Sequence, residues 1–152
     1  LCEGKISRDA AGTWVHLGDQ KLLLDPSLVA NHGGLEKAID GRTVVVGIRP
    51  EDMEDAAFAD APPERVLKSK VDITEALGSE VMVHFGVDAP QVFTDGAKKN
   101  EDEDVHRLGG DHGATFVGSF NARSRVRPGD LVDVAVNTSH LHFFDPATGE
   151  RV

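Results

Sequence analysis

The chain has 152 residues, 39% of them hydrophobic and 28% charged, which is the composition of a soluble globular protein rather than a disordered one. This length suits a single domain, or two small subdomains that share one core. A formal charge of −10 disfavours nucleic-acid binding, and the single cysteine, Cys2, excludes an internal disulfide and disfavours a thiolate zinc site.

The ends and the hydropathy of the chain predict a cytosolic piece of a longer protein. The sequence begins with Leu1 rather than Met. It shows neither a secretory signal nor an apolar run long enough to span a bilayer.

The first 40 residues predict one hairpin and two very short helical segments. Two β-prone runs, residues 13–17 and 21–24, flank the turn-forming cluster Gly18-Asp19-Gln20. Residues 27–30 and 35–39 have room for about one helical turn each.

Residues 43–48 predict a strand, because this run is nearly all apolar and β-branched and is therefore expected to be buried on both faces. It ends at Arg49, since a residue before proline favours extended geometry. Pro50 suits the first position of a helix, and a short helix is expected to run through Met53 or Glu54.

The rest of the chain predicts strands separated by turns. A long extended segment at residues 65–76 and a second one at 81–87 are expected to pair across Gly78. Further strands are expected at residues 114–120, 131–136 and 140–144, with turns at 128–130 and 145–149. Many short strands with scarcely any helical periodicity predict an all-β barrel or sandwich.

The stretch from residue 88 to residue 113 differs from its surroundings. It holds seven acidic and three basic residues, a net charge of about −4, and few apolar ones. We expect an acidic, flexible insertion here.

No motif in the sequence predicts catalysis, a bound cofactor or a metal. The sequence has no phosphate-binding loop, because Gly4-Lys5 lacks both the upstream glycine and the following Ser or Thr. His140 and His142 would share one face of a strand, but a third metal ligand is not evident, so surface histidines are the favoured interpretation. No Ser-His-acid arrangement is visible from spacing.

Three arginines alternate at Arg123, Arg125 and Arg127. In an extended chain their guanidinium groups would line one side and form a phosphate or carboxylate clamp or an interface. The favoured alternative is a solvated strand edge, where basic residues discourage unwanted sheet pairing.

Three blocks carry a resemblance to a known family: residues 46–52 (Val-Gly-Ile-Arg-Pro-Glu-Asp), residues 77–80 (Leu-Gly-Ser-Glu), and residues 127–130 with 141–150. In order and spacing they resemble the C-terminal region of the ATP-binding subunits of maltose-importer-type ABC transporters, which also serve trehalose, glycerol phosphate and other carbohydrates. The resemblance implies an oligonucleotide/oligosaccharide-binding-like (OB) barrel of the transport-associated (TOBE, MOP-like) type with extra strands. The insertion at 88–113 departs from it, since the family commonly has a much shorter connection there.

The resemblance implies structural roles for the motif residues. Gly47 would permit close packing of the buried strand, Arg49 would form an ion pair at its end, and Glu80 would lie at the surface or an interface. The full set of implied structural positions is Gly47, Arg49, Pro50, Glu51, Asp52, Gly78, Ser79, Glu80, Gly129, Asp145 and Gly149.

By this resemblance residues 1–152 are a single C-terminal regulatory domain without its ATPase domain. The implied role is to pair two ATP-binding subunits at the cytoplasmic face of the membrane, beside the permease subunits and in some members a regulatory protein. ATP and Mg would bind to the absent ATPase domain, so the chain itself is expected not to be an enzyme. The alternative is a domain that senses an oxyanion or another small ligand.

Overall fold

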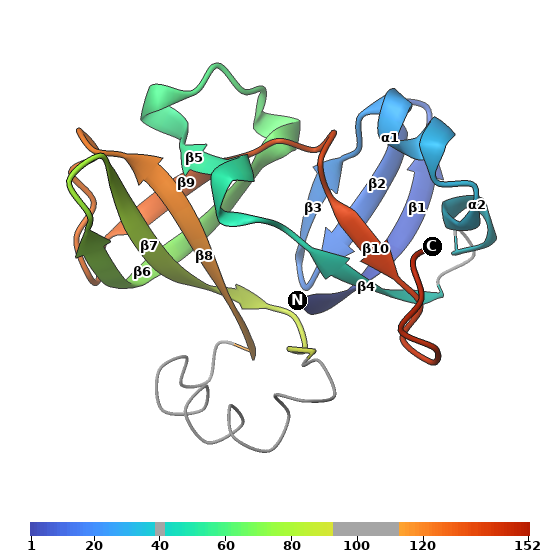
Figure 1. The fold of residues 1–152 in the computed structure, drawn as a ribbon. Helices are drawn as coiled ribbons and strands as arrows, with labels where there is room; N and C mark the ends of the chain where they lie inside the picture. The colour runs from blue at the N-terminus through green and yellow to red at the C-terminus, as the bar shows by residue number, and fades with distance from the viewer. Residues whose placement is uncertain (39–41, 93–112) are drawn as a thin grey trace.

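The computed structural model describes residues 1–38, 42–92 and 113–152. Figure 1 shows two antiparallel sheets side by side, one drawn from blue to teal with a red strand, the other from green to orange. The predicted all-β, OB-like architecture is confirmed. No helix within the described ranges combines the length and apolarity needed to cross a membrane.

The first sheet holds the predicted hairpin and the buried strand. Its strand order is β10-β4-β1-β2-β3. Val44 and Val46 of β4 belong to the main core while Val45 is buried on the opposite face, so this strand is buried on both sides as predicted. The strands are β1 (Cys2–Asp9), β2 (Gly12–Leu17), β3 (Gln20–Leu23), β4 (Thr43–Gly47) and β10 (His142–Phe144).

The helices are short, as predicted. Pro50 begins a 3-10 turn, but this turn ends at Asp52, so the expected helix through Met53 or Glu54 is wrong there. Met53 instead pairs with Val136 as the first residue of a strand. The helical elements are α1 (Pro26–Asn31), α2 (Gly34–Ala38), η1 (Pro50–Asp52), η2 (Ala56–Phe58) and η3 (Pro63–Arg65).

The second sheet curls into a half-barrel. β6 has an irregularity between Val71 and Ile73, and its first half pairs with β9 while its second half pairs with β7. A bulge bends a strand and increases its twist, so the outer strands β5 and β8 come into contact. The order is β5-β9-β6-β7-β8, with β5 (Met53–Asp55), β6 (Val66–Ala76), β7 (Glu80–Asp88), β8 (Gly113–Asn121) and β9 (Leu131–Val136).

The two sheets share one apolar core. A single cluster of buried residues includes Ile6 and Phe143 from the first sheet and Phe85 and Phe120 from the second. Backbone contacts also join the sheets, because Glu3 N–H donates to Pro90 O at 2.9 Å. This packing fixes how the sheets sit relative to each other and therefore where the loops between them meet.

The predicted insertion interrupts the β7–β8 hairpin. Asp88 and Gly113, the two ends of that stretch, are paired residues at the end of this hairpin. Residues 93–112 lie outside the described residues, and the flexibility expected of them stays a prediction.

Candidate functional site

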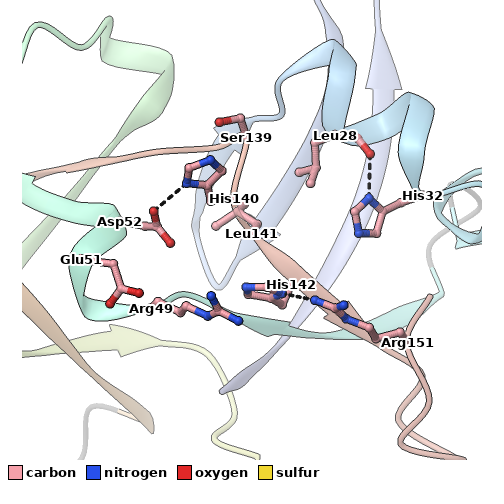
Figure 2. Close-up of a pocket in the computed structure, with 10 residues that line it drawn as sticks. All are labelled: Leu28, His32, Arg49, Glu51, Asp52, Ser139, His140, Leu141, His142 and Arg151. Atoms are coloured by element: carbon pink, nitrogen blue, oxygen red, sulfur yellow. Dashed lines mark hydrogen bonds and ion pairs between the residues drawn. The ribbon is translucent and has the colours of Figure 1, made fainter.

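The family-like motifs before and after the second sheet meet at one pocket of about 540 Å³. Figure 2 shows that its lining comes from α1, from the end of β4 with η1, from the segment that leads into β10, and from Arg151 near the C-terminus. Two buried leucines, Leu28 and Leu141, contribute apolar surface, and most of the remaining lining is charged or imidazole.

The 3-10 turn η1 places three of the motif side chains. Arg49 has extended backbone geometry (φ −76°, ψ 148°), and Pro50 follows as the first residue of the turn. The N–H of Asp52 donates to the carbonyl of Arg49 at 3.0 Å. Arg49 and Glu51 are consequently exposed at the pocket while Asp52 points inward and is only 9% exposed.

Asp52 joins η1 to the segment that precedes β10. The Nδ1–H of His140 donates to Asp52 Oδ1 at 2.9 Å, and the N–H of Asn137 donates to the Asp52 carbonyl at 2.8 Å. This is not a catalytic triad, because the hydroxyl of Ser139 donates to Asn137 Oδ1 at 2.6 Å rather than to His140. The hydrogen bonds of Asp52 thus connect η1 to the segment that precedes β10.

His142 lies between two arginines. Arg151 Nη2 donates to His142 Nδ1 at 2.6 Å, which requires a lone pair on that nitrogen and leaves the proton of the neutral ring on Nε2. Burial, and then the positive charges of Arg49 and Arg151, hold the pKa of His142 below its usual value. The neutral imidazole that accepts from Arg151 is the form that this environment favours.

His32 closes the α1 side of the pocket. Its Nδ1–H donates to the carbonyl of Leu28 one helical turn earlier, at 2.8 Å, and its ring meets Phe143 edge-on at 6.1 Å. These two contacts orient the imidazole and leave Nε2 for other partners.

A metal ion has no evident site here. Hydrogen bonds to Asp52 and Arg151 engage Nδ1 of His140 and His142, so only Nε2 of each ring could bind a metal. Within the described ranges no group of three or more His, Cys, Asp and Glu side chains is arranged to hold a metal. His140 also lies before β10, so the predicted strand 140–144 begins two residues later, at His142.

The three alternating arginines lie away from this pocket. β8 ends at Asn121, so Arg123 is in the following turn, and Arg125 and Arg127 are in irregular chain rather than on a strand edge. All three are exposed, while Ser124 and Val126 between them are partly buried. The exposure of the side chains alternates as expected, but the segment is not a strand. Ser124 is held by its side chain, whose hydroxyl donates a hydrogen bond to Asp55. A ligand or interface role for them stays a prediction.

The remaining motif residues form turns and close packing. A Cβ on Gly47 would lie 2.8 Å from Leu1 Cδ2. Gly78 (φ +85°) and Ser79 make the bend between β6 and β7, and Glu80 accepts a hydrogen bond from the Ser119 hydroxyl. Gly129 N–H donates to Val71 O at 2.7 Å, and Gly149 N–H donates to Asp145 O at 2.8 Å.

Arg49 forms no ion pair with any residue that the structure describes, although the resemblance implies one. Its positive charge instead contributes to lowering the pKa of His142.

No family model matches the chain. The trehalose/maltose import ATP-binding protein MalK of Thermococcus litoralis is 38% identical over 141 residues, which cover 91% of this chain and 31% of that protein. The chain belongs to the family of ATP-binding subunits of carbohydrate importers. The sn-glycerol-3-phosphate import ATP-binding protein UgpC of Burkholderia pseudomallei is 31% identical over 155 residues (99% and 32%), and the oligosaccharides import ATP-binding protein MsmX of Bacillus subtilis is 28% identical over 153 residues (100% and 32%).

The chain spans about a third of the length of these importer ATP-binding subunits and matches their C-terminal region. The family motif predicted Arg49, Glu51 and Asp52 as structural positions. His140 and His142 were considered only as metal ligands, and a pocket shared by these residues was not predicted. His32 and Arg151 were missed, because no local pattern joins residues so far apart in the sequence.

Proposed function

We propose that residues 1–152 are the C-terminal regulatory and dimerisation domain of the ATP-binding subunit of a carbohydrate importer. The proposal rests on the match to the ATP-binding protein MalK of Thermococcus litoralis. This match covers 91% of this chain but only 31% of the relative, at the C-terminal end. A region of this kind contributes to the subunit without containing the nucleotide site, since the sequence has no phosphate-binding loop.

The motif residues support a mechanical rather than a chemical role. Gly47 packs against Leu1, Asp52 holds His140, and Gly129 joins its turn to β6, so each stabilises a junction between elements. A rigid domain of this kind limits how far two attached ATPase domains separate when each copy contacts the other.

The proposed partners follow from this role. A second copy of the subunit pairs with this domain, the permease subunits bind the parent protein, and a regulatory protein docks in some transporters. The parent subunit is a peripheral protein at the cytoplasmic face of the membrane, and ATP and Mg bind to its ATPase domain. The negative charge of the chain argues against nucleic acid as a partner.

Two measurements test the proposal. Sedimentation equilibrium of the full-length subunit, with and without residues 1–152, is expected to show weaker self-association after truncation. ATPase assays of the assembled transporter are expected to show altered control of basal activity with the same truncation. Unchanged association together with unchanged ATPase control would contradict the proposal.

A further inference from the structure

The pocket described above concentrates basic side chains in an otherwise acidic protein. Five of its ten lining residues are arginine or histidine, whereas the whole chain carries a charge of −10. The five are His32, Arg49, His140, His142 and Arg151. The two arginines are matched in number by Glu51 and Asp52, so the pocket has no net formal charge, in contrast to the acidic chain as a whole.

The two arginines act at the same point in the pocket. Besides burial, the charges of Arg49 and Arg151 both lower the pKa of His142, and the weaker opposite effect of Asp52 does not outweigh them. Arg151 donates to Nδ1, which leaves the Nε2–H of His142 as a further donor. Figure 2 shows the Arg49 guanidinium, the His142 ring and Arg151 in one row. Two guanidinium groups beside an imidazole N–H are a donor set suited to a phosphate oxygen cluster.

The acidic residues of the pocket do not cancel this arrangement. The carboxylate of Asp52 is buried and accepts from His140, which lies on the η1 side. Glu51 is exposed beside Arg49, and Figure 2 shows it on the far side of Arg49 from Arg151. Neither of the two lining carboxylates therefore lies on the side of the pocket formed by His142, Arg151 and His32.

We propose that this pocket binds an oxyanion of the phosphate class, either free phosphate or the phosphate group of a small monoester. The volume of about 540 Å³ exceeds what one phosphate ion occupies and lies within the range of small-molecule sites. Leu28 and Leu141 offer apolar surface to the carbon part of a monoester. The site is independent of the proposed role in subunit pairing and is distinct from the arginines at 123, 125 and 127.

Calorimetric titration of the 152-residue chain at constant ionic strength tests the site. The titrants are inorganic phosphate, glycerol phosphate, sulfate and uncharged glycerol. Saturable binding of phosphate or glycerol phosphate is expected, and none of glycerol. Tighter binding of glycerol phosphate identifies a monoester as the preferred ligand, whereas equal affinity identifies the phosphate group alone; either result supports the site. Equal heats from all four titrants, or no saturation by about 10 mM, would overturn it.

Variants locate the site. Arg49→Gln and Arg151→Gln are each expected to weaken phosphate binding about tenfold or more, because each removes a charge-assisted donor. Arg123→Gln is the matched control, since it also removes one exposed arginine, and its affinity is expected to be unchanged. Loss of binding in Arg123→Gln with retention in the two pocket variants would overturn the assignment. Circular dichroism checks that each variant is folded.

A second readout follows the ring itself. In nuclear magnetic resonance titrations, saturating phosphate is expected to raise the pKa of His142, because an anion near Nε2 favours the protonated ring against the two arginines. An unchanged His142 titration curve under saturating phosphate would contradict the proposed location.

Discussion

The side-chain amide of Gln20 forms two hydrogen bonds with the backbone of Lys68. Gln20 Nε2 donates to the Lys68 carbonyl at 2.7 Å, and the Lys68 N–H donates to Gln20 Oε1 at 2.7 Å. Gln20 begins the edge strand β3 of the first sheet, while Lys68 lies in β6 of the second. The amide therefore satisfies backbone groups of β6 where β7 does not yet pair with it, and it ties the two sheets together.

Gln20→Ala is expected to destabilise the chain by about 1–3 kcal/mol, because it removes both hydrogen bonds, each with a net contribution of about 0.5–1.5 kcal/mol. Urea denaturation measures the change. Asp19→Ala, one residue earlier in the exposed turn, is the control and is expected to stay within about 0.5 kcal/mol of the parent. Equal stability of Gln20→Ala and the parent would show that water replaces the amide without cost.

Local patterns predicted the strands that are rich in apolar β-formers, and they missed β1 and the three-residue strand β5. β4 and the β2–β3 hairpin are rich in apolar β-formers, but the inward positions of β1 are Cys2, Gly4 and Ile6. Glycine lowers β-propensity, so this run did not predict a strand. Gly4 is there because a Cβ would lie 2.8 Å from Val46 Cγ2, which is a tertiary constraint that the sequence does not display.

The candidate site was predictable in part for the same reason. Arg49, Glu51 and Asp52 were singled out from one contiguous motif, whereas the Asp52–His140 hydrogen bond joins residues 88 apart. The fold that brings α1, η1 and Arg151 to one pocket depends on the pairing of β10 with β4, an antiparallel contact between distant segments. Periodicity alone does not specify such pairings.

Two glycines with positive φ are expected to respond very differently to alanine. At Gly18 (φ +63°) a Cβ would lie 1.9 Å from the Asp88 carbonyl oxygen, whereas at Gly78 (φ +85°) nothing lies within 4 Å. Gly78→Ala adds only backbone strain and is expected to cost about 1 kcal/mol. Gly18→Ala also forces β7 away from the β2–β3 turn and is expected to cost about 3 kcal/mol or more. Similar midpoints in thermal denaturation of the two variants would contradict this close contact.

The thiol of Cys2 is expected to be inert in the folded chain. Its side chain is fully buried, and burial raises its pKa to about 11. Only about 0.1% is then thiolate at pH 8, and thiolate is the reactive form. Reaction with an aromatic disulfide reagent is expected to follow unfolding, so it accelerates with added urea and reaches one thiol per chain in the denatured state. Complete labelling of the native protein within seconds would show that Cys2 is accessible.

Acid is expected to weaken the contact between Asp9 and Trp14. The Trp14 indole N–H donates to Asp9 Oδ1 at 2.9 Å, and this bond, helped by the N–H groups of Ala11 and Gly12, holds the pKa of Asp9 below its ordinary value. Because the pKa is lower in the folded than in the unfolded chain, the carboxylate stabilises the fold above about pH 4, and this contribution is lost as the pH falls through the folded value. Asp9→Asn is therefore expected to be less stable than the parent at pH 6 and to approach it at pH 2.5, as measured by urea denaturation with Trp14 fluorescence.

Trp14→Phe, followed by circular dichroism, removes the principal donor to Asp9 and should show the same convergence of stability with the parent at low pH. A parent–variant difference that is equal at both pH values would mean that the charge of Asp9 contributes nothing to folding.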